Sequence, residues 1–315
     1  MGKVAFIFPG QGSQSVGMGQ DIASHSAKAK AVFDKANEVL GYDLQKLCFF
    51  GPEEELKATY HTQPALVTTS IALLEAGKQE LPKPDFVAGH SLGEYSALVA
   101  AGVLSFEDAV YAVRKRGELM DNAVPFGKGS MAAVLGADTA LIQETCEAVL
   151  KQGKTVGIAN INCPGQIVIS GVKEGVSEVS TLLKENGVKK IIELSVSGPF
   201  HSDLMRPASE KLQSVLDELT FTDASVPVIT NIDGKEKKDA SDLKSALISQ
   251  VYSSVQWEES IQYMIGQGVD TFIEIGSGKV LTGLVKKIDR NCKMFNIFDT
   301  ESLQSVINEL TNSHV

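Results

Sequence analysis

The chain has 315 residues, of which 43% are hydrophobic and 22% are charged, so it can bury a sizeable core and is neither disordered nor collagen-like. This length predicts two domains or one elaborated domain. The 39 acidic and 29 basic residues give a net charge of -10, which repels phosphate backbones and argues against nucleic-acid binding outside a local basic patch.

Cysteine spacing and the N-terminus bear on the cellular compartment. The apolar run at 4–8 ends at Pro9 and is too short for a signal-peptide core or a membrane span. No CxxC spacing suggests a metal site or a redox couple, which is typical of a reduced protein. We therefore expect a soluble, unprocessed, cytoplasmic protein with no membrane contact. The four cysteines are Cys48, Cys146, Cys163 and Cys292.

Short apolar runs alternate with amphipathic stretches along most of the chain. This alternation is the pattern of a parallel β-sheet covered by helices, and thus of an α/β fold. No repeat or low-complexity segment interrupts it. The predicted strands are 4–8, 86–88, 226–229 and 271–275.

The middle of the chain has a different order of elements, β-α-β-β-α-β, which is the ferredoxin-like order. Because 125–129 and 195–199 look like paired crossings, we expect a small domain at 126–196 inserted into a large one formed by 1–125 and 197–315. A ligand site is expected in the cleft between them. The predicted elements are strand 131–135, helix 139–151, strands 156–161 and 166–170, helix 173–186 and strand 189–194.

Residues 89–93 read Gly-His-Ser-Leu-Gly, a GxSxG sequence between the predicted strand 86–88 and a helical stretch at 94–101. In a nucleophile elbow, the glycines allow a strained turn that lifts the serine hydroxyl above the sheet, next to a helix N-terminus that favours negative charge. The motif also occurs by chance, so the flanking strand and helix carry the prediction that Ser91 is a nucleophile rather than part of a structural turn.

A serine nucleophile needs a base, and five histidines are available: His25, His61, His90, His201 and His314. His25 lies in a polar helical run, and His61 opens a predicted helix as a cap or surface residue. The elbow turns His90 away from the serine, and His314 lies in a tail. His201 follows the second domain crossing in a loop-forming segment, from which it can reach the cleft. Its alternative role is that of a hydrogen-bonded turn histidine.

No acid stands out as the partner that would orient His201. Asp203 is too close in sequence to fold back readily, and Asp233, Asp270 and Glu274 have no distinguishing context. A backbone or side-chain carbonyl could hold the imidazole tautomer instead.

The segment 8–14, Phe-Pro-Gly-Gln-Gly-Ser-Gln, is similar to a dinucleotide-binding turn but fails in detail. Ser15 stands where the third glycine belongs, and Pro9 stiffens the turn. The use we favour is an oxyanion hole, in which the backbone N–H of Gln11 acts beside that of Leu92, the residue after the nucleophile.

A capping box begins at Ser105 and opens the next helix, whose apolar residues occupy one sector of the helical wheel. Arg116 lies at the edge of that sector, where a guanidinium needs an anionic partner. The partner is either a structural acid or a substrate carboxylate held bidentately in the cleft.

Taken together, these segments strongly resemble the bacterial malonyl-CoA:acyl carrier protein transacylases of fatty-acid synthesis. The resemblance implies a large hydrolase-like α/β domain with the ferredoxin-like insert. Two departures are visible: Cys163 replaces a small non-thiol residue, and Ser277 replaces a proline, which leaves its loop less rigid. The match covers nearly the whole chain, through 8–14, 89–95, Arg116, 162–166, 198–202, 250–257 and 276–284.

The resemblance also implies roles for individual residues. Ser91 would be the nucleophile, His201 the base, and the N–H groups of Gln11 and Leu92 the oxyanion hole. The remaining implied roles are binding of the malonyl carboxylate by Arg116, orientation of His201 by the backbone carbonyl of Gln250, and substrate binding by Phe200 and Asn162.

The implied reaction is a ping-pong transfer of the malonyl group from malonyl-CoA to the phosphopantetheine thiol of acyl carrier protein, through a malonyl-serine. It needs no cofactor and no metal, and we expect a monomer. The closest alternative is a serine esterase or thioesterase with the same Ser-His pair. A non-catalytic scaffold that binds acyl carrier protein is the other.

Acyl carrier protein and coenzyme A are both anionic, so docking to this acidic chain requires a local basic region. Lys189 with Lys190, and Lys286 with Lys287 and Arg290, are the candidates. The alternative is that these are ordinary solvated side chains.

Overall fold

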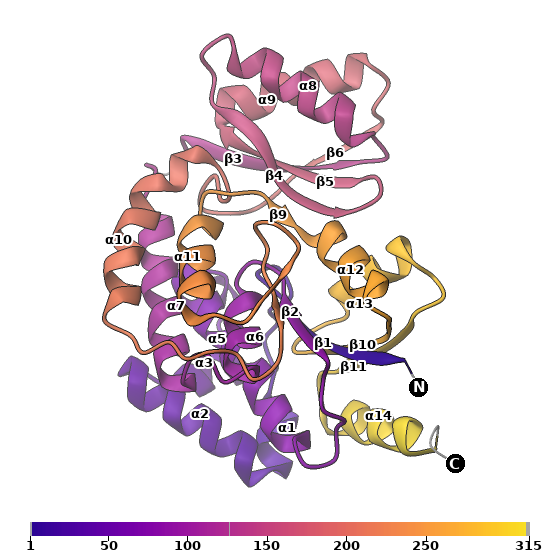
Figure 1. Cartoon of the computed structure of the whole chain (residues 1–315). Coiled ribbons are helices and arrows are strands. Elements are labelled where there is room, and N and C mark those ends of the chain that lie inside the picture. Colours follow the sequence, from indigo (N-terminus) through magenta and orange to yellow (C-terminus); the bar gives the residue numbers. More distant parts are fainter. Residues whose placement is uncertain (1, 126, 313–315) are drawn as a thin grey trace.

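The computed structural model describes residues 2–125 and 127–312, which fold into an α/β structure with two β-sheets (Figure 1). The larger sheet has the strand order β11-β10-β1-β2-β7-β8, and all neighbouring pairs are parallel except the antiparallel pair of β7 with β8. Its strands are β1 (Lys3–Phe8), β2 (Phe86–Gly89), β7 (Val228–Ile229), β8 (Glu236–Lys237), β10 (Val269–Ile275) and β11 (Lys293–Ile297).

The central strand β1 is buried on both faces because alternate side chains enter two different cores. Val4, Phe6 and Phe8 belong to the larger hydrophobic cluster, whereas Ala5 and Ile7 belong to the second. A strand buried in this way has a continuous apolar sequence, and the predicted helix-covered parallel sheet is confirmed.

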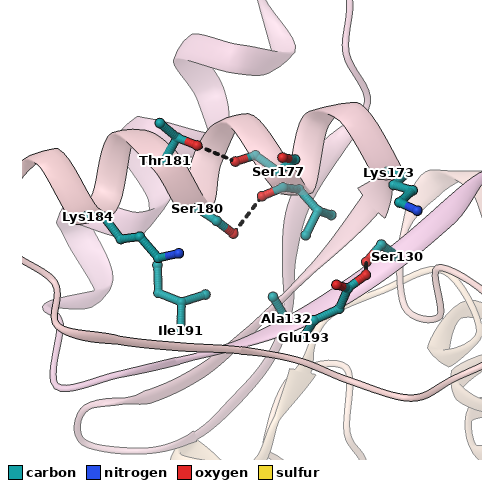
Figure 2. A pocket seen from close by; sticks show the side chains of 10 residues that line it. Ser130, Ala132, Lys173, Ser177, Ser180, Thr181, Lys184, Ile191 and Glu193 are labelled. Atoms are coloured by element: carbon teal, nitrogen blue, oxygen red, sulfur yellow. Dashed lines mark hydrogen bonds between the residues drawn. The ribbon is translucent and has the colours of Figure 1, made fainter.

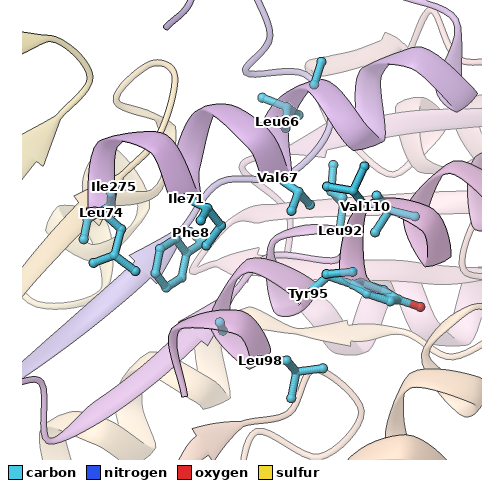
Figure 3. Close-up of a cluster of buried hydrophobic side chains, with 14 of the residues drawn as sticks. Phe8, Leu66, Val67, Ile71, Leu74, Leu92, Tyr95, Leu98, Val110 and Ile275 are labelled. Atoms are coloured by element: carbon cyan, nitrogen blue, oxygen red, sulfur yellow. The ribbon is translucent and has the colours of Figure 1, made fainter. Parts of the chain in front are cut away.

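Helices cover both faces of this sheet (Figure 1). The long helix α5 is buried almost all round, and Figure 3 shows its apolar side chains gathered near Phe8 and α6. The helices of this part are α1 (Gln20–His25), α2 (Ala27–Leu40), α3 (Leu44–Phe50), α4 (Glu53–Leu56), α5 (Thr59–Gly77), α6 (Gly93–Ala100), α7 (Phe106–Asp121), α10 (Arg206–Asp217), α11 (Ala240–Gln250), α12 (Trp257–Gly266), α13 (Val280–Ile288) and α14 (Thr300–Asn312), with the 3₁₀ turn η1 (Asp203–Met205).

The second sheet has the strand order β6-β3-β5-β4-β9. Its first four strands and two helices follow one another as β-α-β-β-α-β, so the predicted order of elements is confirmed. In this order the elements are β3 (Gly129–Leu135), α8 (Thr139–Leu150), β4 (Val156–Cys163), β5 (Gln166–Val172), α9 (Lys173–Glu185) and β6 (Lys190–Glu193).

The fifth strand of the small sheet, β9 (Val255–Gln256), comes from outside the predicted insert and pairs in parallel with β4. This pairing ties the small sheet to the rest of the molecule next to the turn that follows α11. The proposed division at 126–196 stays a prediction, and Phe126 lies outside the described residues. None of the helices in the described ranges is both long and apolar enough to cross a bilayer.

Candidate active site

The GxSxG segment forms a sharp turn between β2, which ends at Gly89, and α6, which begins at Gly93. Ser91 has φ 49°, a left-handed conformation that is uncommon for a residue with a side chain. A Cβ on Gly89 would lie 1.9 Å from the carbonyl carbon of Gly93, and one on Gly93 would lie 2.1 Å from the oxygen of Phe8. Only glycine fits at these two positions, and this is the geometry of a nucleophile elbow.

The imidazole of His201 meets the Ser91 hydroxyl, with Nε2 2.8 Å from Oγ. On the other side of the ring, Nδ1 lies 2.9 Å from the backbone oxygen of Gln250 and 3.2 Å from that of Ser253. Carbonyl oxygens only accept hydrogen bonds, so the proton sits on Nδ1 and Nε2 is left to accept the serine proton. Burial, and then the positive charge of Arg116, lower the pKa of His201 to about 3, so its ring is neutral near pH 7.

Arg116 lies on α7 and is 1% exposed. Its Nη2 donates to Ser91 Oγ at 3.1 Å and to Gln250 Oε1 at 2.9 Å, and its Nη1 donates to Gln63 Oε1 at 2.9 Å. Its Nε has no partner among the described residues. Among the described residues, every hydrogen-bond acceptor of the guanidinium is a neutral oxygen, the Tyr95 ring lies 5.8 Å away, and no carboxylate contacts it. Burial lowers the pKa of Arg116.

The turn after β1 lies against the elbow. His90 donates its backbone N–H to the oxygen of Phe8 at 3.0 Å, and a Cβ on Gly10 would lie 2.4 Å from the oxygen of His90. As a result, Gln11 and Leu92 line the same cavity. Neither the N–H of Gln11 nor that of Leu92 donates a hydrogen bond within the described residues, so both are available to an acceptor in the cavity.

The cavity has a volume of about 110 Å³ and lies where the small sheet faces the elbow. Side chains of β3 and β4 contribute to it, as expected for a site between the two parts of the molecule. Its lining residues are Gln11, His90, Ser91, Leu92, Arg116, Met120, Met131, Asn160, Leu194, Val196, Phe200 and His201.

Of the two further residues predicted to bind substrate, Phe200 lines this cavity and Asn162 does not. The Oδ1 of Asn162 lies 2.8 Å from Nε2 of His90, whose ring packs against Trp257 with the centroids 5.5 Å apart. Asn160, two residues earlier on β4, lines the cavity instead. Asn162 thus contacts the ring of His90, which itself lines the cavity, and its role in substrate binding stays a prediction.

Three buried polar residues at the site were missed by sequence reasoning: Gln63, Asn231 and Glu94. The first accepts from the Arg116 guanidinium. Asn231 accepts from the backbone N–H of Ser91 at 2.6 Å and donates to the oxygen of Gly89 at 2.7 Å. A signal for Asn231 was present, because it follows β7 at the carboxyl edge of the parallel sheet, where sites form in α/β folds.

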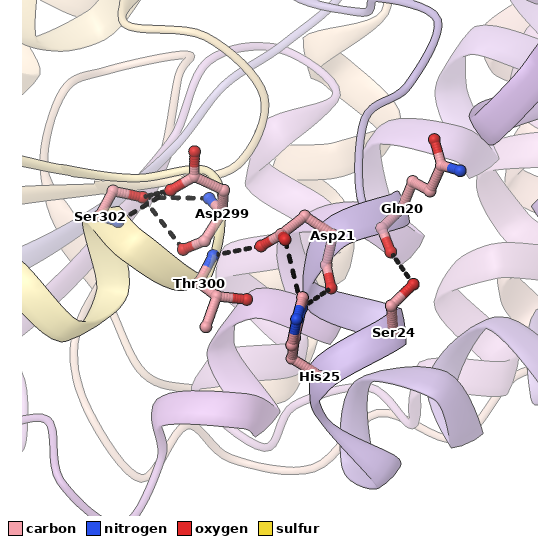
Figure 4. A network of polar contacts seen from close by, with 7 residues as sticks. All are labelled: Gln20, Asp21, Ser24, His25, Asp299, Thr300 and Ser302. Carbon is pink, nitrogen blue, oxygen red and sulfur yellow. Dashed lines mark hydrogen bonds and ion pairs between the residues drawn. The ribbon is translucent and has the colours of Figure 1, made fainter.

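His25 and His61 make their contacts away from Ser91. His25 is exposed, and its Nδ1 lies 3.2 Å from a carboxyl oxygen of Asp21, which in turn accepts from the backbone of Thr300 (Figure 4). The Nδ1 of His61 lies 3.0 Å from the oxygen of Glu55. His314 lies outside the described residues.

A second cavity lies between α9 and the strands β3 and β6 of the small sheet (Figure 2). Ser130 donates there to Glu193 at 3.1 Å. Its lining contains serines, two lysines and Glu193 but no histidine or cysteine, so it does not repeat the Ser-His pair of the elbow. Within the described ranges, no group of three or more His, Cys, Asp or Glu side chains could hold a metal ion.

Among known proteins, the family model described as acyl transferase domain matches residues 5–307. The malonyl CoA-acyl carrier protein transacylase of Bacillus subtilis (strain 168) is 55% identical over 310 residues, which are 98% of each chain. The protein of the same name from Staphylococcus aureus (strain MW2) is 48% identical over 304 residues, 96% of this chain and 98% of that one.

Solved structures agree with these sequence relatives. The crystal structure of an acyl carrier protein S-malonyltransferase from Vibrio cholerae O1 biovar eltor has a TM-score of 0.94 and 46% identity, covering 96% of this chain and 99% of that chain. A malonyl-transacylase solved in complex with a type II PKS acyl-carrier protein has a TM-score of 0.95 and 42% identity, covering 98% and 99%. The chain therefore belongs to the acyl transferase family, with the malonyl-CoA:acyl carrier protein transacylases that its motifs resemble.

Proposed function

We propose that this protein transfers the malonyl group of malonyl-CoA to the phosphopantetheine thiol of an acyl carrier protein through a malonyl ester on Ser91. The observation that carries this proposal is Arg116, a fully buried cation 3.1 Å from the nucleophile whose partners in the described chain are all neutral. No carboxylate of the described chain contacts this buried guanidinium, so the site favours an acyl group that brings its own carboxylate into contact with it.

In the first half-reaction, Ser91 Oγ attacks the thioester carbonyl carbon while Nε2 of His201 takes the hydroxyl proton. The negative charge that develops on the carbonyl oxygen is met by the free N–H groups of Gln11 and Leu92. The carbon–sulfur bond then breaks, and the coenzyme A thiolate leaves with the proton held by His201. The backbone oxygen of Gln250 keeps the Nδ1 proton in place during both transfers.

In the second half-reaction, the phosphopantetheine thiol gives its proton to Nε2 of His201 as its sulfur attacks the malonyl ester. Ser91 leaves as the alcohol with that proton, and the malonyl thioester of the carrier protein is released. These steps use only side-chain and backbone groups of this chain and call for no cofactor or metal.

Acyl carrier protein as the partner is supported by the relatives, one of which was solved with such a protein bound. We also propose a monomeric, cytoplasmic enzyme. The cytoplasmic assignment is supported by the four cysteines, all of which are free and buried in the structure.

The test is intact-protein mass spectrometry after brief incubation with malonyl-CoA, for the wild type and for Ser91→Ala, followed by phosphopantetheinylated acyl carrier protein. The wild type is expected to gain a malonyl adduct that then moves to the carrier, and Ser91→Ala is expected to gain none. An adduct that decays to free malonate at the same rate with or without the carrier would identify a hydrolase instead. Absence of any adduct on the wild type would overturn the proposal.

A further inference from the structure

A buried carboxylate, Glu94, lies directly behind the nucleophile and takes no part in the reaction steps above. It is on the first turn of α6 and is 0% exposed. Its Oε2 accepts from the backbone N–H of Asn231 and from Nε2 of Gln250, both at 2.9 Å, whereas its Oε1 has no partner among the described residues. Both residues that it holds also contact the backbone of Ser91, as does the backbone N–H of Glu94 itself.

The contact with Gln250 determines which way its side-chain amide points. Its Nε2 donates to Glu94 and, at 3.0 Å, to the backbone oxygen of Ser91, while its Oε1 accepts from Nη2 of Arg116. The Glu94 carboxylate and the Ser91 carbonyl only accept hydrogen bonds and the guanidinium only donates them, so Glu94 adds to the selection of the amide nitrogen on its side and of the amide oxygen on the side of Arg116. The reversed amide would place its NH₂ group against Arg116 and its oxygen against Glu94, with both contacts repulsive.

We propose that Glu94 is a positioning residue for malonyl selection: by setting the amide of Gln250, it holds the guanidinium of Arg116 beside Ser91 in the geometry that receives the acyl carboxylate. The inference deepens the proposed function and rests on it. The amide also separates the negative charge of Glu94 from the positive charge of Arg116, so the two groups attract without forming a contact ion pair.

Several groups act on the charge of Glu94. Burial raises its pKa to about 7, while the bonds from Asn231 and Gln250 and the charge of Arg116 oppose that rise and Asp233 adds to it. The buried hydroxyl of Tyr95, next along α6, also lies in this region. Because pH 8 lies above this pKa, most Glu94 side chains are ionised there, and the assays are run near that pH.

The decisive variants are Glu94→Met, which keeps the length of the side chain but removes both acceptors, and Glu94→Gln, whose side-chain oxygen can still accept both hydrogen bonds. The measurement is a competition between malonyl-CoA and acetyl-CoA, with the acetyl thioester in an excess at which the wild type shows both adducts on Ser91. Because both adducts form on the same molecules, their ratio does not depend on the fraction of protein that is folded.

We expect Glu94→Met to lower the malonyl-to-acetyl ratio by about 10- to 100-fold, the range for a buried polar contact left unpaired. Glu94→Gln should stay within about 3-fold of the wild type, since the orientation of the Gln250 amide persists. An unchanged ratio in Glu94→Met overturns the inference. A wild type that forms no malonyl adduct overturns the proposed function itself, which separates the two failures.

A double-mutant cycle tests whether Glu94 acts through the amide. Gln250→Met removes the amide but keeps the backbone carbonyl that contacts His201. If the effect of Glu94 passes through that amide, adding Glu94→Met to Gln250→Met changes the ratio no further. If the two substitutions instead make independent contributions to the fall in the malonyl-to-acetyl ratio, the assignment is overturned.

Glu274→Gln is the matched control, because Glu274 is also a buried carboxylate that accepts backbone N–H groups, from Leu281 and Thr282 at the start of α13. It has no contact with the groups around Ser91. We expect this variant to unfold at a lower temperature while keeping the wild-type adduct ratio. A ratio that falls in the control as it does in Glu94→Met would mean that general destabilisation causes the effect.

Discussion

Arg116 is the residue whose placement says most about the substrate. It was predicted at the edge of an apolar helical sector, and the structure buries it with two amide oxygens and the nucleophile as its partners. Amide oxygens orient a guanidinium but do not neutralise it, so its charge stays available to an acyl carboxylate.

Replacing Arg116 with alanine should remove the preference for malonyl groups. We expect malonyl transfer to fall by about 10²-fold or more, since the acyl carboxylate would be buried without a partner, while acetyl transfer rises relative to it. Separate kcat/KM values for malonyl-CoA and acetyl-CoA measure this change. Arg116→Lys is the control that keeps the charge without the planar fork. A malonyl preference that survives in Arg116→Ala would disprove the role of Arg116.

The pKa of His201 predicts how stability depends on pH. Because burial lowers that pKa from 6.5 to about 3, the unfolded chain binds a proton between these values that the folded chain does not. The stabilisation from a neutral His201 is therefore complete above pH 6.5 and is lost progressively as the pH falls towards 3, by up to about 1.4 kcal/mol per pH unit.

Glu94 acts in the opposite direction, because its raised pKa makes the folded chain bind the extra proton between pH 4.5 and about 7. The test is therefore the difference in unfolding free energy between the wild type and His201→Gln, in which the contribution of Glu94 cancels. Urea titrations from pH 7 to pH 4.5 should show this difference falling as the pH is lowered. A constant difference would contradict a depressed pKa for His201.

At the scale of single elements, α7 connects a surface cap to the buried guanidinium. The Oγ of Ser105 accepts from the backbone of Asp108 at 3.0 Å, as the capping box predicts, and Arg116 lies about three turns further along the helix. The cap therefore contributes to the stability of the helix without touching the site.

Ser105→Ala should lower the free energy of unfolding by about 1 kcal/mol, because the N-cap hydrogen bond is lost. Urea denaturation of this variant and the wild type measures the change. The malonyl-to-acetyl ratio should stay at the wild-type value. A loss of selectivity without a loss of stability would show that the cap acts on the site rather than on the helix.

The elements that the sequence pattern predicted are the ones with strong local signals. The runs at 4–8 and 271–275 lie within β1 and β10, and the helix expected at 139–151 is α8 to within one residue. The short strands β8 and β9 and the edge strand β11 were not predicted. They have two, two and five residues, so β8 and β9 are too short to show an alternating pattern, and β9 also pairs with β4, which is distant in sequence.

At the scale of the whole molecule, the net charge of -10 must be reconciled with an anionic carrier protein. Lys286 and Arg290 are exposed at the end of α13, whereas Lys287 donates to Gln166 at 2.9 Å and so links α13 to β5.

The loop before α13 also reaches the active-site turn, because Ser277 Oγ donates to the oxygen of Ser13 at 2.7 Å. This contact tethers a loop that was expected to be less rigid.

We expect carrier docking to be steered by Lys286 and Arg290. Reversing both charges to glutamate should raise KM for the carrier and weaken the dependence of transfer on ionic strength. Ser91 malonylation by malonyl-CoA measures the half-reaction without the carrier. The same charge reversal at Lys189 and Lys190 tests the other basic pair. If the KM for the carrier changes only in that variant, the docking surface lies at Lys189 and Lys190 instead.

The sequence by itself determined the nucleophile elbow, the histidine loop, the parallel sheet and the β-α-β-β-α-β order of elements. In each of these, neighbouring residues carry the signal, through glycines that a tight turn requires or through hydrophobic periodicity. The sequence also left open whether an acid or a carbonyl orients His201, and whether Arg116 pairs with a structural acid.

Only the tertiary structure decided those questions, because each depends on contacts between segments distant in sequence, 49 residues apart for His201 and Gln250 and 134 for Arg116 and Gln250. It places the Gln250 amide between Arg116 and Glu94, with Asn231 against the elbow, and it pairs Asn162 with His90. A buried polar side chain is defined by the partner that satisfies it, and a sequence pattern does not contain that partner.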